Sequence, residues 1–371
     1  MSDLAQFQLL AGQFVDAVAQ YESARDEAGL ERLRRLRLEI VPALLELSVA
    51  AVQGCLPSIM QFAGTCVRSG IRNFPRTPTE NELFARCLER LLPWTPDTAP
   101  VQGLPALLLA HHAFELKFIP PLASIPAAAR EAWVYFLCEK PPAFIHSGDA
   151  EQFALYLANL CRRICENLNK ADGSADDLIE AFSRSGIFMQ SYFNELNLRG
   201  TMRLRGTIIE QMLERGGGSL DQLRVMRPIR QRPRIGFISL VLDDGSETVF
   251  LAAHMQHLDR ARYEVRLYSL FEPNGSVGAR CREWAHDYAR LPEKVEQAVA
   301  RLRREDLDLA IFCNNLTAVN HPLTRVAAHR VARIQASTIA SPVSTGLRNI
   351  DVMIPVKRTR QPILNSITTS A

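Results

Sequence analysis

The sequence lacks the features that mark several large classes of protein. No apolar run reaches the roughly 18 residues that a membrane-spanning helix needs. The first six residues form no basic segment followed by an apolar one, as a secretory signal would. The net charge is only +3, so no global electrostatic field points to nucleic acid or a membrane as a partner. We therefore expect a cytoplasmic protein that binds neither.

Sequence patterns typical of metal, redox and nucleotide sites are also absent. The cysteines form no Cys-x-x-Cys pair and have no histidine at zinc-ligand spacing; they are Cys55, Cys66, Cys87, Cys138, Cys161, Cys165, Cys281 and Cys313. Cys161 and Cys165 share one face of an expected helix, where two buried small residues are favoured over a redox site. No Gly-x-Gly-x-x-Gly, phosphate loop, kinase signature or nucleophile elbow occurs. We expect free thiols, no metal and no cofactor.

What the sequence does contain is the composition of a globular protein with more than one domain. It has 371 residues, of which 47% are hydrophobic and 22% charged. Up to about residue 220, apolar residues recur every three or four positions and predict an all-α domain over 1–215. The expected helices are 4–27, 30–54, 59–69, 80–92, 105–118, 127–139, 150–167, 175–184 and 196–215.

One helical stretch resembles half of a tetratricopeptide repeat. Gly12, Ala17, Tyr21 and Ala24 stand where such repeats place the small and aromatic residues that pack two helices together. In this interpretation Gly12 permits a close approach between the helices. No copy of the pattern follows about 34 residues later. A repeat-like scaffold and an ordinary amphipathic helix therefore remain two alternatives.

A glycine- and arginine-rich stretch, 216–231, predicts a linker between two domains. Three consecutive glycines from Gly216 end the preceding helix and add flexibility. Arginines then follow without an intervening acid, at Arg224, Arg227, Arg230, Arg232 and Arg234. They could hold a phosphate group, but a solvated linker face is the favoured interpretation.

From residue 232 onward, strands and helices alternate, which predicts a parallel, doubly wound sheet over 232–356. Strands are expected at 234–242, 263–271, 307–312, 334–339 and 350–356, and helices at 247–258, 278–288, 293–304 and 324–332. Residues 357–371 show little pattern and are expected to be an unstructured tail. The predicted fold class is α plus α/β, an all-α domain followed by a Rossmann-like domain.

Ligands of such sheets gather at the carboxyl ends of the strands, so the loops there hold the candidate site. In chain order, the candidate residues are Ser246 and Glu247, then Asn314, Asn315 and Thr317, then Ser341, Pro342, Thr345 and Gly346. The first group could cap a helix or meet an anion. The second could hold a sugar or phosphate, or cap the next helix. The third lies in a proline- and glycine-shaped loop that presents hydroxyl groups, and it is the best candidate.

Acidic and histidine pairs elsewhere have simpler interpretations. Asp243 and Asp244 are adjacent, so their side chains diverge and suit helix capping better than acid–base catalysis. The His111–His112 pair is expected within an apolar helix, as packed or surface residues. His254 and His257 share a helix face but lack a third metal ligand nearby in the sequence.

Four parts of the second half follow one another in an order shared with a known family. They are Arg232-Pro-Arg-Ile-Gly-Phe-Ile-Ser239 with His257-Leu-Asp-Arg-Ala-Arg-Tyr-Glu-Val-Arg-Leu-Tyr268, Asp306-Leu-Asp-Leu-Ala-Ile-Phe312, His329-Arg-Val-Ala-Arg-Ile-Gln335, and Ser341-Pro-Val-Ser-Thr-Gly346 with Ile350-Asp351. The last two resemble an Arg-Pro-Ala-Pro-x-Gln segment and a Gly-Tyr-Pro-x-Thr-[ST]-Gly…Met-Asp-Tyr motif. Together they resemble the N-terminal part of the catalytic region of the O-GlcNAc transferase (SPINDLY-like) family, glycosyltransferase family 41. The branch near the bacterial adhesin glycosyltransferases is included in this resemblance.

The resemblance implies part of a two-domain GT-B glycosyltransferase that works without a metal. Such enzymes transfer a sugar, usually N-acetylglucosamine from UDP-GlcNAc, to Ser or Thr of an acceptor protein, and the adhesin branch transfers hexose to Asn. The uridine diphosphate would bind chiefly to a second Rossmann-like domain, while loops of the first face the acceptor and the sugar. By position, Pro342, Thr345 and Gly346 match the family's active-site loop.

This chain departs from the family in two loops and in length. Where many members have a histidine after the first and third strands, it has Gly245-Ser-Glu247 and Leu316-Thr-Ala318, so no catalytic residue is named. A second domain would need roughly 150 residues, and 20 follow Asp351. We therefore expect a truncated form that is inactive alone. The alternative is a non-catalytic helical scaffold with a relict Rossmann-like domain that binds protein partners.

Overall fold

The computed structural model describes residues 2–91, 99–116, 119, 125, 127–141, 143–168, 176–184, 188–221, 228 and 230–354. The chain divides into two compact units. One comprises Met1–Gly218 and Thr317–His321, and the other comprises Ser219–Leu316 and Pro322–Ala371. Among the described residues, no helix is both long and apolar enough to cross a lipid bilayer.

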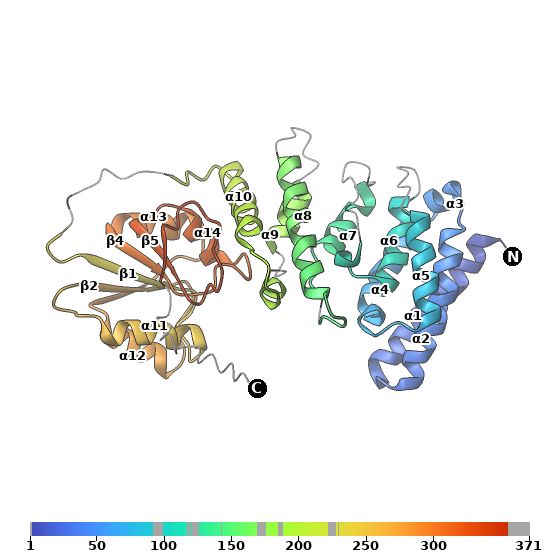
Figure 1. Ribbon diagram of the computed structural model, residues 1–371, viewed down its shortest axis with the longest axis horizontal. Coiled ribbons are helices and arrows are strands. Elements are labelled where there is room, and N and C mark those ends of the chain that lie inside the picture. The colour runs from blue at the N-terminus through green and yellow to red at the C-terminus, as the bar shows by residue number, and fades with distance from the viewer. Residues whose placement is uncertain are drawn as a thin grey trace, which may run out of the picture. The chain divides into compact units, whose positions relative to one another are not determined.

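The first unit is helical, which confirms the all-α prediction (Figure 1). Its α-helices are α1 (Asp3–Ala24), α2 (Glu27–Leu45), α3 (Val49–Gly54), α4 (Leu56–Ser69), α5 (Pro78–Leu91), α6 (Ala99–Ala110), α7 (Ala127–Leu137), α8 (Asp149–Leu168), α9 (Asp176–Arg184) and α10 (Arg199–Arg215). Short 3-10 helices are η1 (Ile71–Asn73), η2 (Ala113–Glu115) and η4 (Met189–Phe193).

Side-chain caps decide where several of these helices begin. Ser2 caps α1 by accepting a hydrogen bond from the N–H of Ala5, and Asp26 caps α2 by accepting one from Gly29. Ser48 does the same for α3. The helix predicted over 30–54 is therefore wrong as a single helix, because α2 ends at Leu45 and a newly capped helix starts after Ser48.

Two further predictions about the helical unit are also wrong. His111 and His112 do not lie within a helix, because α6 ends at Ala110 and the chain turns toward η2. Gly12 does not bring two helices together, since a Cβ added there would meet nothing within 4 Å. The close approach lies at Gly29, where an added Cβ would be 3.1 Å from Cδ2 of Tyr21 in α1.

The second unit is a six-stranded parallel sheet in the order β3-β2-β1-β4-β5-β6. The strands are β1 (Arg234–Ser239), β2 (Glu264–Ser269), β3 (Asp287–Arg290), β4 (Leu307–Phe312), β5 (Ala332–Thr338) and β6 (Val352–Ile354). The helices α11 (Ser246–His257) and α12 (Ser276–Trp284) cover one face, and α13 (Val295–Glu305) and α14 (Pro322–Ala328) the other (Figure 1). This order is that of a doubly wound dinucleotide-binding fold, which confirms the Rossmann-like prediction.

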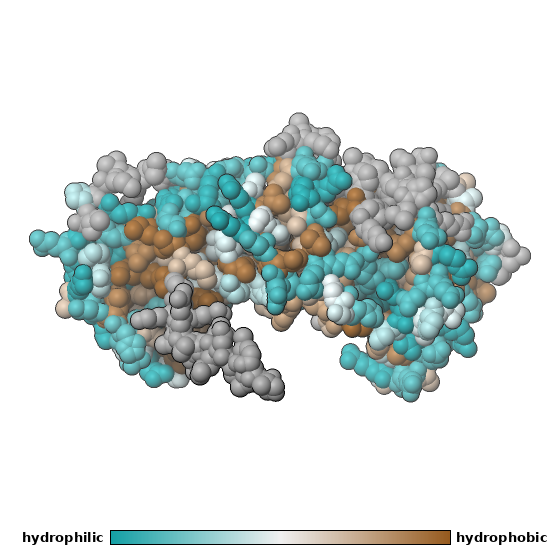
Figure 2. All heavy atoms as spheres, viewed as in Figure 1, coloured by the Kyte–Doolittle hydropathy of each residue, from teal (hydrophilic) through white to brown (hydrophobic). Residues whose placement is uncertain are grey.

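The central strands carry the core of this unit. In register, Ile235 of β1 lies opposite Val265 of β2 and Leu309 of β4. The cluster on one face of the sheet includes Phe237, Leu251 and Met255. Buried apolar strands with helices on both faces are what a parallel sheet requires. Figure 2 shows hydrophobic residues gathered over this unit.

An edge strand, β3, was not predicted. The sequence favours a helix over 278–288, whereas α12 ends at Trp284 and the chain then pairs with β2 from Asp287 to Arg290. None of its residues is buried. A short, exposed edge strand has neither the apolar run nor the clear alternation by which strands are recognised in a sequence.

Two of the arginines after the glycine linker, Arg230 and Arg234, bind carboxylates at the sheet, whereas Arg224 and Arg227 lie outside the described residues. Arg230 forms ion pairs with Asp306 and Asp308, the latter at 3.1 Å. Arg234 pairs with Glu264 at 3.1 Å. For these arginines the solvated-face interpretation is wrong, because carboxylates near the amino ends of β2 and β4 lie within reach.

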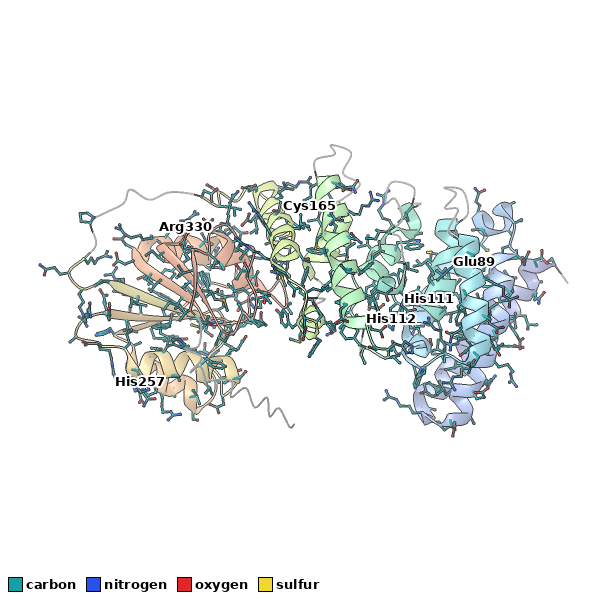
Figure 3. The ribbon with its side chains drawn as sticks, viewed as in Figure 1. Glu89, His111, His112, Cys165, His257 and Arg330 are labelled. Carbon is teal, nitrogen blue, oxygen red and sulfur yellow. The ribbon has the colours of Figure 1, made fainter. Side chains whose placement is uncertain are left out.

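All eight cysteines are free, and Cys161 is buried while Cys165 is half-buried, as predicted (Figure 3). Burial raises the pKa of Cys281 to about 11 and that of Cys138 to about 12. These thiols therefore remain protonated at neutral pH and act as small apolar residues.

Candidate functional site

The strand order reverses between β1 and β4, which makes their carboxyl ends the ligand-binding edge of this topology. The connection that leaves β1 forms α11 on one face of the sheet. The connection that leaves β4 forms α14 on the other face. In this topology, ligands bind where two such connections leave the sheet in opposite directions. The candidate residues in the loops after β1 and β4 lie at this switch point.

Glu247, in the first turn of α11, joins these two loops. Its Oε1 accepts a hydrogen bond from the backbone N–H of Asn315 at 2.6 Å, and its Oε2 accepts one from Nδ2 of Asn314. In turn, Oδ1 of Asn314 accepts hydrogen bonds from the N–H of Leu240 at 2.6 Å and the hydroxyl of Ser239 at 3.1 Å. Glu247, Asn314 and Asn315 thus come together, and they hold the loops in place.

The loop after β5 is attached to the same network. Ser341, which is fully buried, accepts a hydrogen bond from the N–H of Leu316 at 3.0 Å. Thr345 is also buried, and its hydroxyl accepts a hydrogen bond from the N–H of Leu347 at 3.3 Å. Gly346 has a φ of +72°, a conformation that favours glycine. Pro342 is exposed, so this loop presents its proline to solvent and keeps its hydroxyls for internal bonds.

The start of α11 differs from the prediction of a side-chain cap. Its N-cap residue is Gly245, which has no side chain to accept a hydrogen bond from the backbone of the first turn. Asp244 instead accepts hydrogen bonds from the N–H of Val277 at 2.8 Å and from Ser276, at the start of α12. Ser246 is exposed, and binding of an anion at this helix start stays a prediction.

The segment after β4 contains a further amide of the same polar cluster, beyond the candidate residues named above. Asn320 is 8% exposed, and neither its Oδ1 nor its Nδ2 has a hydrogen-bond partner. Thr317, nearby, hydrogen-bonds the hydroxyl of Tyr192, and both residues belong to the first unit. The excess of amide side chains between 314 and 320 was the available signal for Asn320. A buried amide without partners is suited to a ligand that both donates and accepts hydrogen bonds.

The described loops provide no free general base. Asp243 accepts hydrogen bonds from the N–H of Gly245 and the hydroxyl of Thr248, both at 2.9 Å, and Glu247 is occupied by the two asparagines. Burial raises the pKa of Cys313 far above neutrality. Among the described residues, no three His, Cys, Asp or Glu side chains are placed to hold a metal ion. The site can bind polar groups through backbone N–H, amide and hydroxyl groups.

Residues of two family-like segments bind one another at the edge of β5. Arg330 (Figure 3) pairs with Asp351 through two contacts of 2.6 and 3.1 Å, and the N–H of Gln335 donates to the same carboxylate at 2.8 Å. Burial alone would raise the pKa of Asp351, but the hydrogen bonds from Arg330 and Gln335 outweigh it and lower the pKa. These contacts close the loop that carries Pro342, Thr345 and Gly346.

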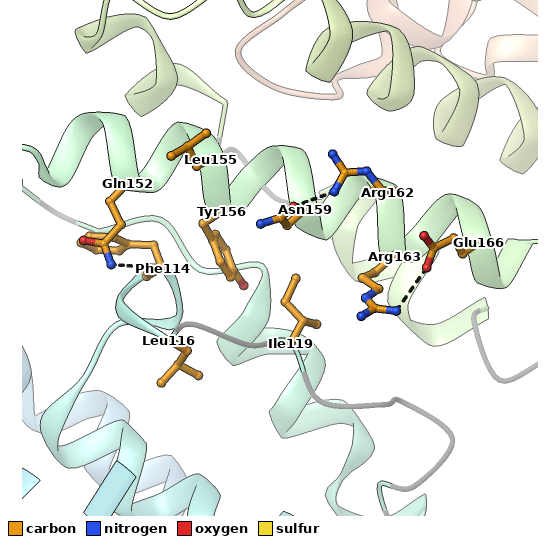
Figure 4. Close-up of a pocket in the computed structure, with 10 residues that line it drawn as sticks. All are labelled: Phe114, Leu116, Ile119, Gln152, Leu155, Tyr156, Asn159, Arg162, Arg163 and Glu166. Atoms are coloured by element: carbon orange, nitrogen blue, oxygen red, sulfur yellow. Dashed lines mark hydrogen bonds and ion pairs between the residues drawn. The ribbon is translucent and has the colours of Figure 1, made fainter. Parts of the chain in front are cut away.

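Two cavities lie in the helical unit rather than at the sheet. One, about 530 Å³, is a groove along α8 that includes Leu155, Tyr156 and Arg163 (Figure 4). Its polar side chains are engaged, since Arg162 donates to Asn159 at 2.7 Å and Arg163 to Glu166 at 3.3 Å. The other, about 290 Å³, is lined by histidines and arginines and is termed the histidine cavity.

Comparison with known proteins finds similarity among solved structures. No protein-family profile matches the chain, and no curated protein matches it. Among solved structures, the chain is similar to a mutant O-GlcNAc transferase from Thermobaculum terrenum, with a TM-score of 0.41 and 16% sequence identity. The similarity covers 95% of this chain and 54% of that chain, so this chain spans about half the length of the solved protein.

Proposed function

We propose that this chain carries the helical domain and the acceptor-side Rossmann-like domain of a protein glycosyltransferase that resembles the O-GlcNAc transferase (SPINDLY-like) family. The observation that carries the proposal is the bonding of Arg330 and Gln335 to Asp351. These residues belong to two separate segments of the sequence resemblance. Their contacts attach the start of β6 to β5, and the loop 341–346 lies in the connection between these two strands.

In this proposal, the three loops at the carboxyl edge face the acceptor protein and the transferred sugar, GlcNAc from UDP-GlcNAc. Glu247 and Asn314 are positioning residues, because their polar atoms already bind other loop groups. Backbone N–H groups at the start of α11 supply donors for a ligand. The uridine diphosphate would bind chiefly to a second Rossmann-like domain, so we expect the 371-residue polypeptide alone to bind UDP-GlcNAc weakly and to be inactive. Its free thiols suit the cytoplasm.

A second candidate function is a non-catalytic scaffold that binds protein partners. The observation in its favour is that the acidic groups of the edge, Asp243, Asp244 and Glu247, all accept hydrogen bonds from the protein itself. A relict domain needs such bonds for its stability but needs no ligand. This candidate predicts no affinity for a sugar nucleotide.

Methyl-group NMR of the full chain distinguishes the two. We expect UDP-GlcNAc at about 10 mM, enough to occupy most sites with a Kd of about 1 mM, to shift the methyl signals of Ala318 and Ala340 next to the candidate loops. The methyl signals of Leu307 and Ala332, at the opposite ends of β4 and β5, serve as the control and should stay in place. Unchanged signals at Ala318 and Ala340 would reject the glycosyltransferase proposal and favour the scaffold.

A further inference from the structure

The histidine cavity lies in the helical unit and is lined largely by polar and ionisable side chains. Its buried part is formed by Arg72, His111, His112 and Phe114 (Figure 3 labels the two histidines). Exposed residues, among them His146, line its open side. The cavity therefore connects solvent with a polar floor, an arrangement that helix packing by itself does not require.

Two groups on this floor lack hydrogen-bond partners. The side chain of Arg72 is 2% exposed; its Nη2 pairs with Glu139, while its Nη1 has no partner. The Nδ1 of His111 lies 2.8 Å from a carboxylate oxygen of Glu115, while its Nε2 has no partner. A buried guanidinium nitrogen without an acceptor costs free energy of folding. A ligand that brings an acceptor would remove this cost, which favours its binding here.

The carboxylates that line the cavity are already occupied. Glu115 accepts hydrogen bonds from Arg76 at 2.7 Å and from His111. Asp149, at the start of α8, accepts hydrogen bonds from the backbone N–H groups of Ile145 at 2.9 Å and His146 at 2.7 Å. A cation would find no free carboxylate among these residues, whereas an anion would find free donors.

The charges around His112 are mainly positive, which favours binding of an anion. Burial lowers the pKa of His112 to about 4, and the positive charges of Arg72 and Arg76 act in the same direction as burial, as does His111. Glu115 opposes them without reversing the shift. The ring of His112 stacks on Phe114 and has no carboxylate partner among the described residues. A bound anion would reverse the effect of the arginines and favour protonated His112.

We propose that the histidine cavity binds a small oxyanion, a carboxylate or phosphate group, that accepts hydrogen bonds from Arg72 Nη1, from Nε2 of His111 and from the protonated ring of His112. His146 lies at the entrance, and Arg76 stays bound to Glu115. The site belongs to the helical unit and is independent of the sheet edge. It would therefore serve recognition or regulation whichever of the two proposed functions holds.

The test is calorimetric titration of the full chain with inorganic sulfate, whose charge stays constant between about pH 5.5 and about pH 8. We expect saturable binding that is about tenfold tighter at the lower pH, because the anion binds together with a proton on His112. His112→Asn should weaken binding by about tenfold at low pH. His146→Gln, at the exposed entrance, is a second variant that leaves the buried floor intact and should weaken binding less.

His257→Gln, at an exposed position of α11 in the other unit, is the matched control and should bind sulfate as the unmodified chain does. Parallel titrations with inorganic phosphate and with malonate identify the ligand type, and tighter binding of either one supports the proposal. Absence of saturable binding by all three anions at low pH would overturn it. So would equal sulfate affinity in the unmodified chain and in His112→Asn.

Discussion

Two glycines of this chain differ in the space that a side chain would have at their positions. At Gly278, in α12, an added Cβ would lie 2.5 Å from the carbonyl oxygen of Leu242, in the loop after β1. That obstacle is main chain, which cannot swing aside as a long side chain does. The helix can therefore pack on this loop only without a side chain at 278. At Gly12, in α1, no atom lies within 4 Å of an added Cβ.

Replacing each of these glycines with alanine should have opposite effects on stability. Gly278→Ala should lower the free energy of unfolding by about 1–3 kcal/mol, because α12 must move away from the loop. Gly12→Ala should raise it by up to about 1 kcal/mol, because alanine favours the helix and has open space. Urea denaturation of both variants measures the difference. Equal destabilisation by the two would contradict the packing described for α12.

At the scale of elements, one buried ion pair connects the starts and ends of several helices. Arg37 of α2 and Glu80 of α5 are both fully buried and lie 2.6 Å apart, Nε to Oε1. Arg37 also donates to the carbonyls of Ile71 and Leu109, each at 3.2 Å. Glu80 and Thr77 form a reciprocal capping box at the start of α5, with Thr77 N–H donating to Glu80 at 2.7 Å.

Breaking this pair on one side should cost more than replacing both partners. Glu80→Ala leaves a buried guanidinium without its carboxylate and should lower the free energy of unfolding by about 3–5 kcal/mol. Arg37→Met combined with Glu80→Gln should cost clearly less, because no charge stays buried and Gln retains the capping role. Denaturant unfolding followed by helical circular dichroism measures both.

Glu31→Ala is the matched control for Glu80→Ala. Glu31 is exposed and pairs with Arg34 at 3.8 Å, so its loss should change stability by less than about 1 kcal/mol. A double variant as unstable as Glu80→Ala would contradict this prediction. It would show that the hydrogen bonds of the pair, rather than neutralisation of a buried charge, determine its contribution to stability.

At the scale of the whole molecule, the two edges of the sheet differ in how readily they can pair with a strand of another chain. The β3 edge carries Asp287 and Arg290, charged residues that oppose pairing with another strand. The β6 edge instead exposes Val352 by 48% and Met353 by 39%. An apolar edge strand in the described sheet is a template for a strand from another chain.

We therefore expect the 371-residue polypeptide to self-associate through β6. Met353→Lys should shift the molecule toward monomer in size-exclusion chromatography with light scattering, because a charge at the edge opposes pairing. Val249→Lys, on an equally exposed position of α11, is the control and should leave the association unchanged. A monodisperse monomer of the unmodified chain would contradict this prediction.

The grouping of the candidate residues at one edge of the sheet could be predicted from the sequence. The hydrogen bonds that they form with one another could not. Loops after parallel strands meet at one edge whatever their residues, so the sequence positions of Glu247, Asn314 and Ser341 sufficed to group them. That Glu247 binds Asn314 depends on contacts between residues 67 apart in the chain. Nothing in local spacing indicates that such side chains are consumed by internal hydrogen bonds.

The sequence by itself determined that an all-α part precedes a doubly wound parallel sheet, because helical and buried-strand periodicities are local properties of the chain. Only the tertiary structure decided that β3 is a strand, since its pairing with β2 outweighs weak local preference. It also decided that Arg72 and His112 share a cavity and that Arg37 is buried against Glu80. Each of these depends on which groups far apart in the chain meet after folding, and for Arg37 and Glu80 burial away from water makes a partner necessary.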